Sequence, residues 1–285
     1  MIIIKLKGGL GNQMFQYAAG KAAATKLGTD LKIDLEWFTN LPPSDTPRSF
    51  ELNQFNITAS IAKEKEIGGA RAKGFQTLAR LIRTKVFRHF DDPLPSRAKS
   101  RESLYLEGFW QNEKYFQNIG DIIKKEFTLR SPFTSGAENM LKEIQTKDAV
   151  SLHIRRGDYV SDTKTKQHHG TCSPDYYKKA IKLIKEKLPN PHFFIFSDDK
   201  KSAENMLGLN SDITYVSGEA KIGDAEEIIL MSLCKHNIIA NSSFSFWGAW
   251  LNQNLHKIVI APTQWTSSKK ADNVIPRNWI QIQNI

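Results

Sequence analysis

The sequence contains few features that would place the protein in a membrane or in an oxidising compartment. Its apolar runs are short, and none approaches the roughly 20 residues that span a bilayer. The start, MIIIKLKGG, carries only three consecutive isoleucines with no charged residue before them, which is too little for a signal peptide. The only cysteines, Cys172 and Cys234, form no CxxC pair, so we expect no disulfide framework. We therefore expect a cytoplasmic protein.

Motifs that bind metals are also missing. The chain contains no Asp-x-Asp, no HExxH and no cluster of cysteines and histidines. A phosphate group bound by this protein would then be stabilised by arginines and helix N-termini. We expect no metal and no cofactor.

Acidic residues are outnumbered by basic ones, and the excess is local. The net charge is +10, and residues 63–101 contribute +7 of it through eleven lysines and arginines against four acidic residues. Apolar residues at 75, 78, 82, 86 and 90 recur at helical spacing within this segment and predict a basic amphipathic helix. The helix either docks on the first domain or makes the protein peripheral to the cytoplasmic face of an anionic membrane.

Predicted strands and helices alternate in two stretches of the chain. The first stretch predicts a strand at 1–7, a helix at 12–27 that ends at Gly28, and a strand at 31–35, followed by a proline-rich loop. After residue 136 the pattern restarts, with elements predicted at 149–154, 174–188, 192–196, 200–207, 213–216, 224–234, 237–240, 244–251 and 257–260. This alternation predicts an α/β protein of two doubly wound domains, at 1–147 and 148–285.

Ligands in such sheets bind beyond the carboxyl ends of the strands. GGLGNQ, residues 8–13, follows the first predicted strand, and its glycines would bring backbone N–H groups of a helix start close to an anion. The stretch matches neither a dinucleotide fingerprint nor a Walker A loop, so an ordinary strand–helix turn is the alternative. The amide side chains of Asn12 and Gln13 favour a ligand-binding role.

SLHIRRGDYV, residues 151–160, places two arginines at the end of a buried strand. The guanidinium groups of Arg155 and Arg156 match phosphate oxygens in a bidentate way. The alternative is a salt bridge within the chain to Asp158. His153 lies inside the strand, where a histidine is more often part of the core. The Arg-Gly-Asp tripeptide is the integrin-binding sequence, which we disregard without a secretion signal.

Two further strand ends carry polar groups. NSSFSFWGAW, residues 241–250, opens a helix whose first N–H groups lie beside Ser242 and Ser243 and favour negative charge. The alternative is a capped core helix. The second is FSDDK, residues 196–200, in which Asp198 could accept hydrogen bonds from the N–H edge of a guanine. The alternative is that the two aspartates cap the following helix. The combined pattern favours a ligand with phosphates, a base and a ribose.

A metal-free nucleotide site on two α/β domains suggests a GT-B glycosyltransferase, with two Rossmann-like domains facing a cleft. Five motifs in this order resemble glycosyltransferase family 11, the α-1,2-fucosyltransferases of the soluble bacterial type: GGLGNQMFQYAAG, GFWQNEKYF, HIRRGDY, FSDD and NSSFSFWGAWL. The resemblance implies GDP-fucose as donor, inversion at the fucose anomeric carbon, no metal, and a galactoside acceptor that meets the first domain.

The resemblance also implies roles for individual residues. Arg155 and Arg156 would hold the diphosphate, and Asp198 would contact guanine or ribose. Asp158, slightly ahead of Glu107, is the candidate general base, with Arg155 also counted as catalytic. The remaining residues expected to line the donor site are Gly11, Asn12, Gln13, His153, Ser242, Ser243 and Phe244.

Other functions stay open at this point. A fucosyltransferase of α-1,3 or α-1,6 linkage and a non-catalytic nucleotide-sugar binder would fit the same site. An RNA-binding protein would need basic residues interleaved with aromatics across a face, whereas here the basic residues gather in one segment. We therefore expect no nucleic-acid partner.

Overall fold

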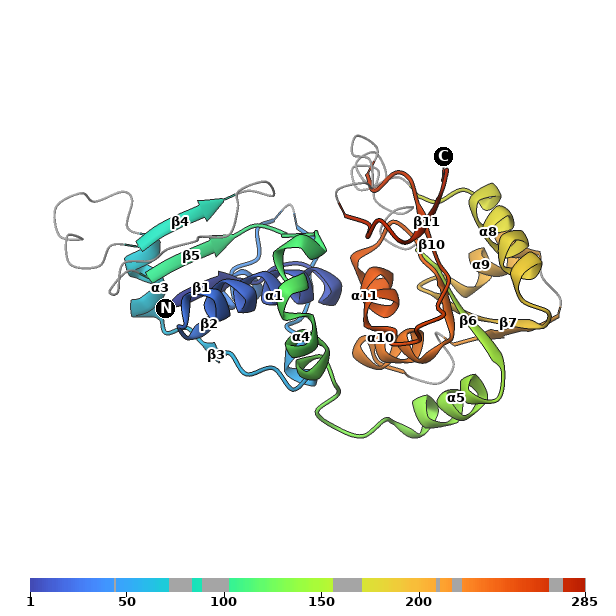
Figure 1. Cartoon of the computed structure of the whole chain (residues 1–285). Helices are drawn as coiled ribbons and strands as arrows, with labels where there is room; N and C mark the ends of the chain where they lie inside the picture. Colours follow the sequence, from blue (N-terminus) through green and yellow to red (C-terminus); the bar gives the residue numbers. More distant parts are fainter. Residues whose placement is uncertain are drawn as a thin grey trace. The chain divides into compact units, whose positions relative to one another are not determined.

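The computed structural model describes residues 1–43, 45–71, 84–88, 103–155, 171–208, 211–216, 222–266 and 274–284. The chain divides into two compact units, Met1–Arg130 and Ser131–Ile285 (Figure 1). Each unit is built around a parallel β-sheet with helices on both faces.

The first unit contains a five-stranded parallel sheet in the order β3-β2-β1-β5-β4. Isoleucine-rich β1 is buried, as is typical of parallel strands with both faces covered. The strands are β1 (Ile2–Lys5), β2 (Leu31–Asp34), β3 (Ser60–Ile61), β4 (Thr84–Arg88) and β5 (Ser103–Glu107). The helices described are α1 (Leu10–Leu27), α2 (Glu36–Thr39), α3 (Glu64–Arg71) and α4 (Gly120–Glu126), with 3-10 turns at Leu52–Gln54, Glu113–Tyr115 and Gln117–Ile119.

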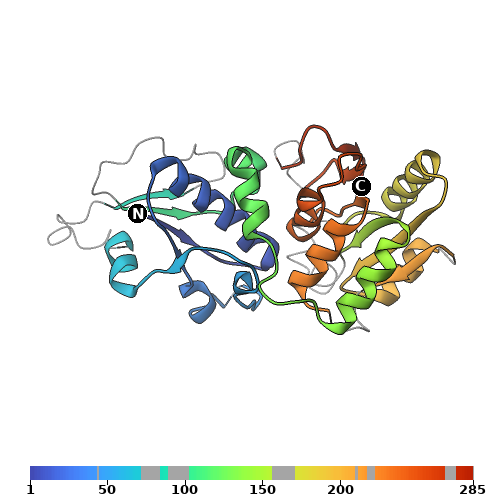
Figure 2. The same cartoon turned by 60° about the horizontal axis from the view of Figure 1, so that its bottom comes forward.

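Helices α1 and α3 cover opposite faces of this sheet (Figure 2). Gly20 brings α1 so close to β1 that an added Cβ would lie 3.1 Å from the Cβ of Ile4. Ile3, the preceding residue of β1, packs against Ile67 of α3. Since successive side chains of a strand point to opposite faces, Lys5 lies on the same face as Ile3, away from α1.

A buried polar network ties α1 to α4. The hydroxyl of Tyr17 donates to Glu126 Oε2 at 2.6 Å, and Thr58 Oγ1 and Lys21 Nζ both lie 2.7 Å from Glu126 Oε1. Burial raises the pKa of Tyr17 well above its usual value, with the Glu126 carboxylate adding to the effect, so the phenol stays protonated. The network satisfies a carboxylate that is itself buried.

The second unit contains a six-stranded parallel sheet in the order β11-β10-β9-β6-β7-β8. Within the unit this is the strand order of a Rossmann fold. The strands are β6 (Asp148–Ile154), β7 (Pro191–Ser197), β8 (Ile213–Tyr215), β9 (His236–Ile238), β10 (Val259–Pro262) and β11 (Ile280–Ile282). The helices are α5 (Ser135–Gln145), α8 (Pro174–Lys187), α9 (Lys200–Leu207), α10 (Asp224–Leu233) and α11 (Ser243–Leu251).

Alternate residues of β6 face two separate cores. Val150 and Leu152 pack against α8 and α9, whereas Ala149 packs against α5 and α10. Helices α10 and α11 approach closely at Gly248, where an added Cβ would lie 2.6 Å from the Cβ of Met231. A side chain at this position would force the two helices apart.

The boundary between the units lies earlier than the sequence predicts. The structure divides the chain after Arg130 rather than after residue 147, and it places α5 in the second unit. Glu226 explains this placement, because its carboxylate accepts hydrogen bonds from the backbone N–H of Thr134 at 2.6 Å and from Gly223 N–H at 3.1 Å. One side chain thereby holds the start of α5 against the start of α10.

Most predicted elements of the second unit match the observed ones within two residues, and helix α1 begins two residues before the predicted start. The predicted basic helix is wrong at residues 84–88, which form β4 and pair with β5; its other residues, 75–83 and 89–90, lie outside the described residues. Strand β5, helix α5 and strand β11 were not predicted. In the part of the chain that the structure describes, no helix is both long enough and apolar enough to cross a membrane.

Candidate functional site

The second unit contains a topological switch point between β6 and β9. From β6 the chain adds β7 and β8 on one side, and then β9, β10 and β11 on the other. The carboxyl ends of β6 and β9 flank this reversal, which is where open α/β sheets bind ligands. Arg155 directly follows β6, and residues 241–244 follow β9 and open α11. The structure thus brings two of the predicted motifs to one sheet edge.

Arg155 forms an ion pair across the strand ends. Its guanidinium Nη1 lies 2.7 Å from Asp198 Oδ2, and both side chains keep about a quarter of their surface exposed, at 23% and 24%. A pair that is this exposed contributes little to stability, but it orients the guanidinium fork at the switch point. The two residues that the sequence assigns to one ligand are therefore already in contact.

Asp199, and not Asp198, caps the following helix. Its carboxylate accepts hydrogen bonds from the backbone N–H of Ser202 at 2.9 Å and from the Ser202 hydroxyl at 2.5 Å. Of the two aspartates, Asp199 therefore has the helix-capping role that was the alternative to ligand binding. Asp198 is left facing Arg155.

His153 is buried beside the start of α11. Its ring centroid lies 5.7 Å from that of Phe244, and its Nδ1 is buried without a hydrogen-bond partner. Burial is the main cause that lowers the pKa of His153 to about 3; the positive charge of Arg155 adds to this, and Asp198 partly offsets it. The imidazole is therefore neutral near pH 7, with one nitrogen able to accept a hydrogen bond.

Replacing His153 by phenylalanine is expected to make the protein less sensitive to acid. An unfolded histidine binds a proton below about pH 6.5, whereas folded His153 does so only near its lowered pKa of about 3. Its contribution to stability is therefore complete above pH 6.5 and is lost as the pH falls through the window down to 3, at about 1.4 kcal/mol per pH unit. Urea unfolding at pH 7 and pH 5 measures the difference.

Exposed His256 provides the matched control, as His256→Phe. The lowered pKa values of His192 and His236 affect every variant alike and cancel in the comparison. A loss of stability between pH 7 and pH 5 that is the same in His153→Phe as in the wild type would show that His153 is accessible to protons in the folded state.

Ser242 caps the N-terminus of α11. Its hydroxyl accepts a hydrogen bond from the backbone N–H of Phe244 at 3.3 Å, and its carbonyl accepts from Phe246 N–H at 3.0 Å. Ser243 is the first residue of the helix and remains half-buried. Capping and ligand binding are compatible here, because the first turn presents several N–H groups.

The GGLGNQ stretch covers the turn after β1 and the first turn of α1 in the first unit. Gly8 adopts a φ of 79°, which a glycine tolerates. Gln13 is fully buried, and its amide donates to the carbonyls of Gly8 and Ser49 at 2.9 and 2.8 Å while it accepts from Glu51 N–H at 3.0 Å. Both N–H donors of this amide are used within the unit, which gives Gln13 a structural role; its donor-binding role stays a prediction.

Asn12 remains half-buried in the first turn of α1, next to buried Gly11. Its Oδ1 accepts a hydrogen bond from the side chain of Gln111 at 2.7 Å. This contact joins the start of α1 to the segment after β5. These two strands flank the point where the strand order of the first sheet reverses.

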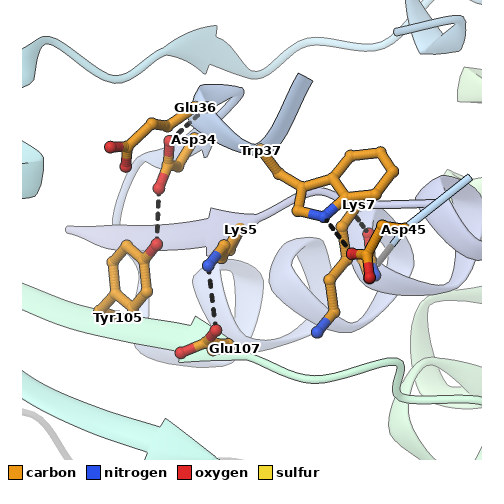
Figure 3. Close-up of polar contacts among 9 residues, drawn as sticks. Lys5, Lys7, Asp34, Glu36, Trp37, Asp45, Tyr105 and Glu107 are labelled. Atoms are coloured by element: carbon orange, nitrogen blue, oxygen red, sulfur yellow. Dashed lines mark hydrogen bonds and ion pairs between the residues drawn. The ribbon is translucent and has the colours of Figure 1, made fainter. Parts of the chain in front are cut away.

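Glu107, one of the two candidate bases, is the last residue of β5. Its Oε1 lies 3.0 Å from Lys5 Nζ at the end of β1 (Figure 3). Lys5 was not predicted as a site residue, although a lysine at the end of an isoleucine strand indicates a polar strand end. Arg156 and Asp158 lie outside the described residues, so the order of preference between the two candidate bases stays a prediction.

Among the residues that the structure describes, no three histidines, cysteines, aspartates or glutamates gather in a way that could hold a metal ion. The cationic group that the structure places at the switch point of the second sheet is the guanidinium of Arg155. Strand ends with arginine, neutral imidazole and a helix N-terminus can bind an anionic group and stabilise negative charge that develops on it.

Two doubly wound α/β units are the architecture of the GT-B fold, as expected from the sequence. Fucosyltransferase NodZ from Bradyrhizobium, which has also been co-crystallised with GDP, superposes with a TM-score of 0.56 at 14% identity over 87% of this chain and 91% of that one. The chain belongs to glycosyl transferase family 11, whose family model matches residues 1–283. The resemblance seen in the five motifs is thereby confirmed.

Two curated relatives refine this classification. An alpha-1,2-colitosyltransferase from Escherichia coli is 33% identical over 99% of this chain and 99% of the relative. The galactoside 2-alpha-L-fucosyltransferase SEC1 from Bos taurus is 25% identical over 87% of this chain and 63% of that protein. Both names describe the transfer of a deoxy sugar to a 2-position.

Proposed function

We propose that this protein transfers L-fucose from GDP-fucose to the 2-hydroxyl of a β-galactoside, with inversion and without a metal. The observation that carries the proposal is the Arg155–Asp198 pair at the switch point of a Rossmann-ordered sheet. A guanidinium at this place suits the diphosphate of a nucleotide sugar. Membership of family 11 and the bovine relative support the fucosyl donor and the linkage.

The reaction would be a single displacement. The acceptor oxygen forms a bond to the anomeric carbon while the bond from that carbon to the β-phosphate oxygen of GDP breaks, and the hydroxyl proton is released. Negative charge grows on the departing phosphate, so Arg155 and the N–H groups at the start of α11 would stabilise the transition state more than the ground state.

His153 fits the donor site as a neutral group. A protonated imidazole would add a second cation near Arg155, which the lowered pKa of His153 opposes. We therefore assign His153 to hydrogen bonding with the nucleotide sugar through its buried Nδ1. The acceptor hydroxyl would then be deprotonated by a carboxylate, and Asp158 and Glu107 are the proposed candidates.

A second donor is favoured by one observation, the 33% identical colitosyltransferase. Colitose is fucose without its 3-hydroxyl, so GDP-colitose would keep the same diphosphate and the same guanine. Contacts to the phosphates would not distinguish the two donors, and the 3-hydroxyl is where selection would occur. GDP-colitose is therefore the alternative donor.

Incubation with GDP-fucose and lactose in the presence of EDTA tests the proposed function. We expect release of GDP that depends on lactose, and a fucosylated product whose NMR spectrum shows a 1→2 linkage. Reactions with GDP-colitose run in parallel. Transfer with GDP-colitose alone, a linkage to another hydroxyl, or activity that EDTA removes and a divalent metal restores would each contradict one part of the proposal.

A further inference from the structure

A row of charged side chains crosses the carboxyl edge of the first unit's sheet. Lys5 ends β1 and is paired in register with Asp34, the last residue of β2, while Glu107 ends β5 on the other side of β1. Register neighbours in a sheet point to the same face. We call Asp34, Lys5 and Glu107 the charged row; it lies on the face away from α1 (Figure 3).

Contacts within the unit fix the charged row. Lys5 Nζ lies 3.0 Å from Glu107 Oε1. The Tyr105 hydroxyl donates to Asp34 Oδ2 at 2.5 Å, and the backbone N–H of Glu36 donates to Asp34 Oδ1 at 2.9 Å. Side chains held by such bonds keep their geometry on binding, which lowers the entropic cost of recognition.

Exposure and charge indicate what the row can bind. Asp34 is fully buried, whereas 21% of the Lys5 side chain and 25% of the Glu107 side chain remain exposed. The row contains two carboxylates, and that of Glu107 is partly exposed. Exposed carboxylate oxygens accept hydrogen bonds from hydroxyl groups, and such charge-assisted bonds are strong.

Aromatic rings lie next to the row. Phe109, two residues after Glu107, is half-buried, and Lys7 Nζ lies 4.8 Å from its ring centroid. Trp37 of α2 packs edge-on against Phe38 at 5.1 Å between ring centroids. Apolar rings beside a few fixed polar groups are typical of small-molecule sites, and they suit the apolar C–H faces of a pyranose.

The turn after β5 is strained at the same edge. Trp110 has a φ of 51°, is fully buried, and its indole Nε1 has no hydrogen-bond partner. Gly108 makes room for this ring, because an added Cβ would lie 3.2 Å from Nε1. Strain that the surrounding packing maintains gathers at binding sites, and this turn sets the direction of Phe109.

We propose that the charged row is a binding site for the neutral acceptor sugar. Glu107 accepts a hydrogen bond from a sugar hydroxyl, and Lys5 is a positioning residue that holds the Glu107 carboxylate in place. Phe109 provides an apolar surface for the sugar ring. The inference rests on the proposed function, since a glycosyltransferase needs a site for the acceptor as well as one for the donor.

Steady-state kinetics of Glu107→Gln, Lys5→Met and Lys5→Arg, with lactose as acceptor, test the proposal. We expect Glu107→Gln to lower kcat/KM for lactose by 10-fold or more, mainly through KM. The KM for GDP-fucose and the calorimetric Kd for GDP should stay within twofold. Lys5→Met should lower kcat/KM for lactose less, and Lys5→Arg should restore it.

The Lys32–Glu66 ion pair offers a matched control. Lys32 lies on β2 of the same sheet, and its pair has similar exposure, at 22% and 17%, but it lies away from the carboxyl edge. Glu66→Gln should leave all constants unchanged. An equal loss in Glu66→Gln, or a Glu107→Gln enzyme with unchanged lactose kinetics, would overturn the proposal.

Saturation-transfer NMR with lactose separates this proposal from the proposed function, because it requires no donor. A lactose signal that Glu107→Gln weakens and Glu66→Gln does not would support the acceptor site even if GDP-fucose is not the donor. A signal that Glu107→Gln leaves unchanged would overturn the acceptor site even if transfer occurs. Urea unfolding of each variant confirms that the fold is kept.

Discussion

Replacing Arg155 by alanine is expected to lower the rate of fucose transfer by about 10²–10³, the usual cost of removing one donor aimed at developing charge. The guanidinium lies at the switch point of the second sheet, where the departing diphosphate would gather negative charge. Because the pair with Asp198 is partly exposed, the fold should be retained. Initial rates of GDP release at saturating lactose measure the effect.

Arg277 provides the control for this variant. It is an exposed arginine of the same unit that shortly precedes β11, at the amino end of the strands. Arg277→Ala should therefore keep full activity. Wild-type turnover in a folded Arg155→Ala protein would remove Arg155 from the reaction and with it the main support for the donor site.

Replacing Asp198 by alanine is expected to lower kcat by about 10–10²-fold, because a catalytic group displaced by about 1 Å can lose that much. In the structure Asp198 holds the Arg155 guanidinium at 2.7 Å. The matched control is Asp148→Ala, since Asp148 also pairs with a cation, Lys235 at 2.6 Å, but at the opposite edge of the sheet. That variant should transfer fucose normally.

The double variant distinguishes two roles for Asp198. If the carboxylate acts through Arg155, adding Asp198→Ala to Arg155→Ala should cost little more, because the two residues work as one unit. If Asp198 instead contacts the guanine on its own, as the family resemblance implies, the two losses should multiply. Multiplicative losses would mean that the ion pair has no positioning role.

The sequence predicted the second unit well because its elements carry strong local signals. Buried runs such as residues 192–196 alternate with capped amphipathic helices such as α9, and tertiary contacts do not override these preferences. Residues 84–88 carry a misleading local signal. Their apolar residues fit a helical spacing, but these residues pair with β5 and form a strand. Strand pairing depends on residues distant in the sequence, so a local pattern does not predict it.

Residues of the candidate site likewise differ in how well the sequence predicts their positions and contacts. The positions of Arg155, Asp198 and Ser242 could be predicted because each follows a recognisable strand. The hydrogen bonds of Gln13 to Ser49 and Glu51 could not be predicted, because these two residues belong to a distant loop. The charged row was missed for a related reason, since only the strand order brings Lys5, Asp34 and Glu107 together.

The contact between Glu226 and Thr134 decides where the chain could be cut to express the second unit alone. A fragment beginning at residue 148 would remove Ala137 and Ile144 from the apolar cluster around Leu230 and Met231 and would leave the buried Glu226 carboxylate with fewer donors. A fragment beginning at Ser131 keeps these contacts. Domain exchange between members of this family should therefore place the junction before α5, so that the helix stays with the second unit.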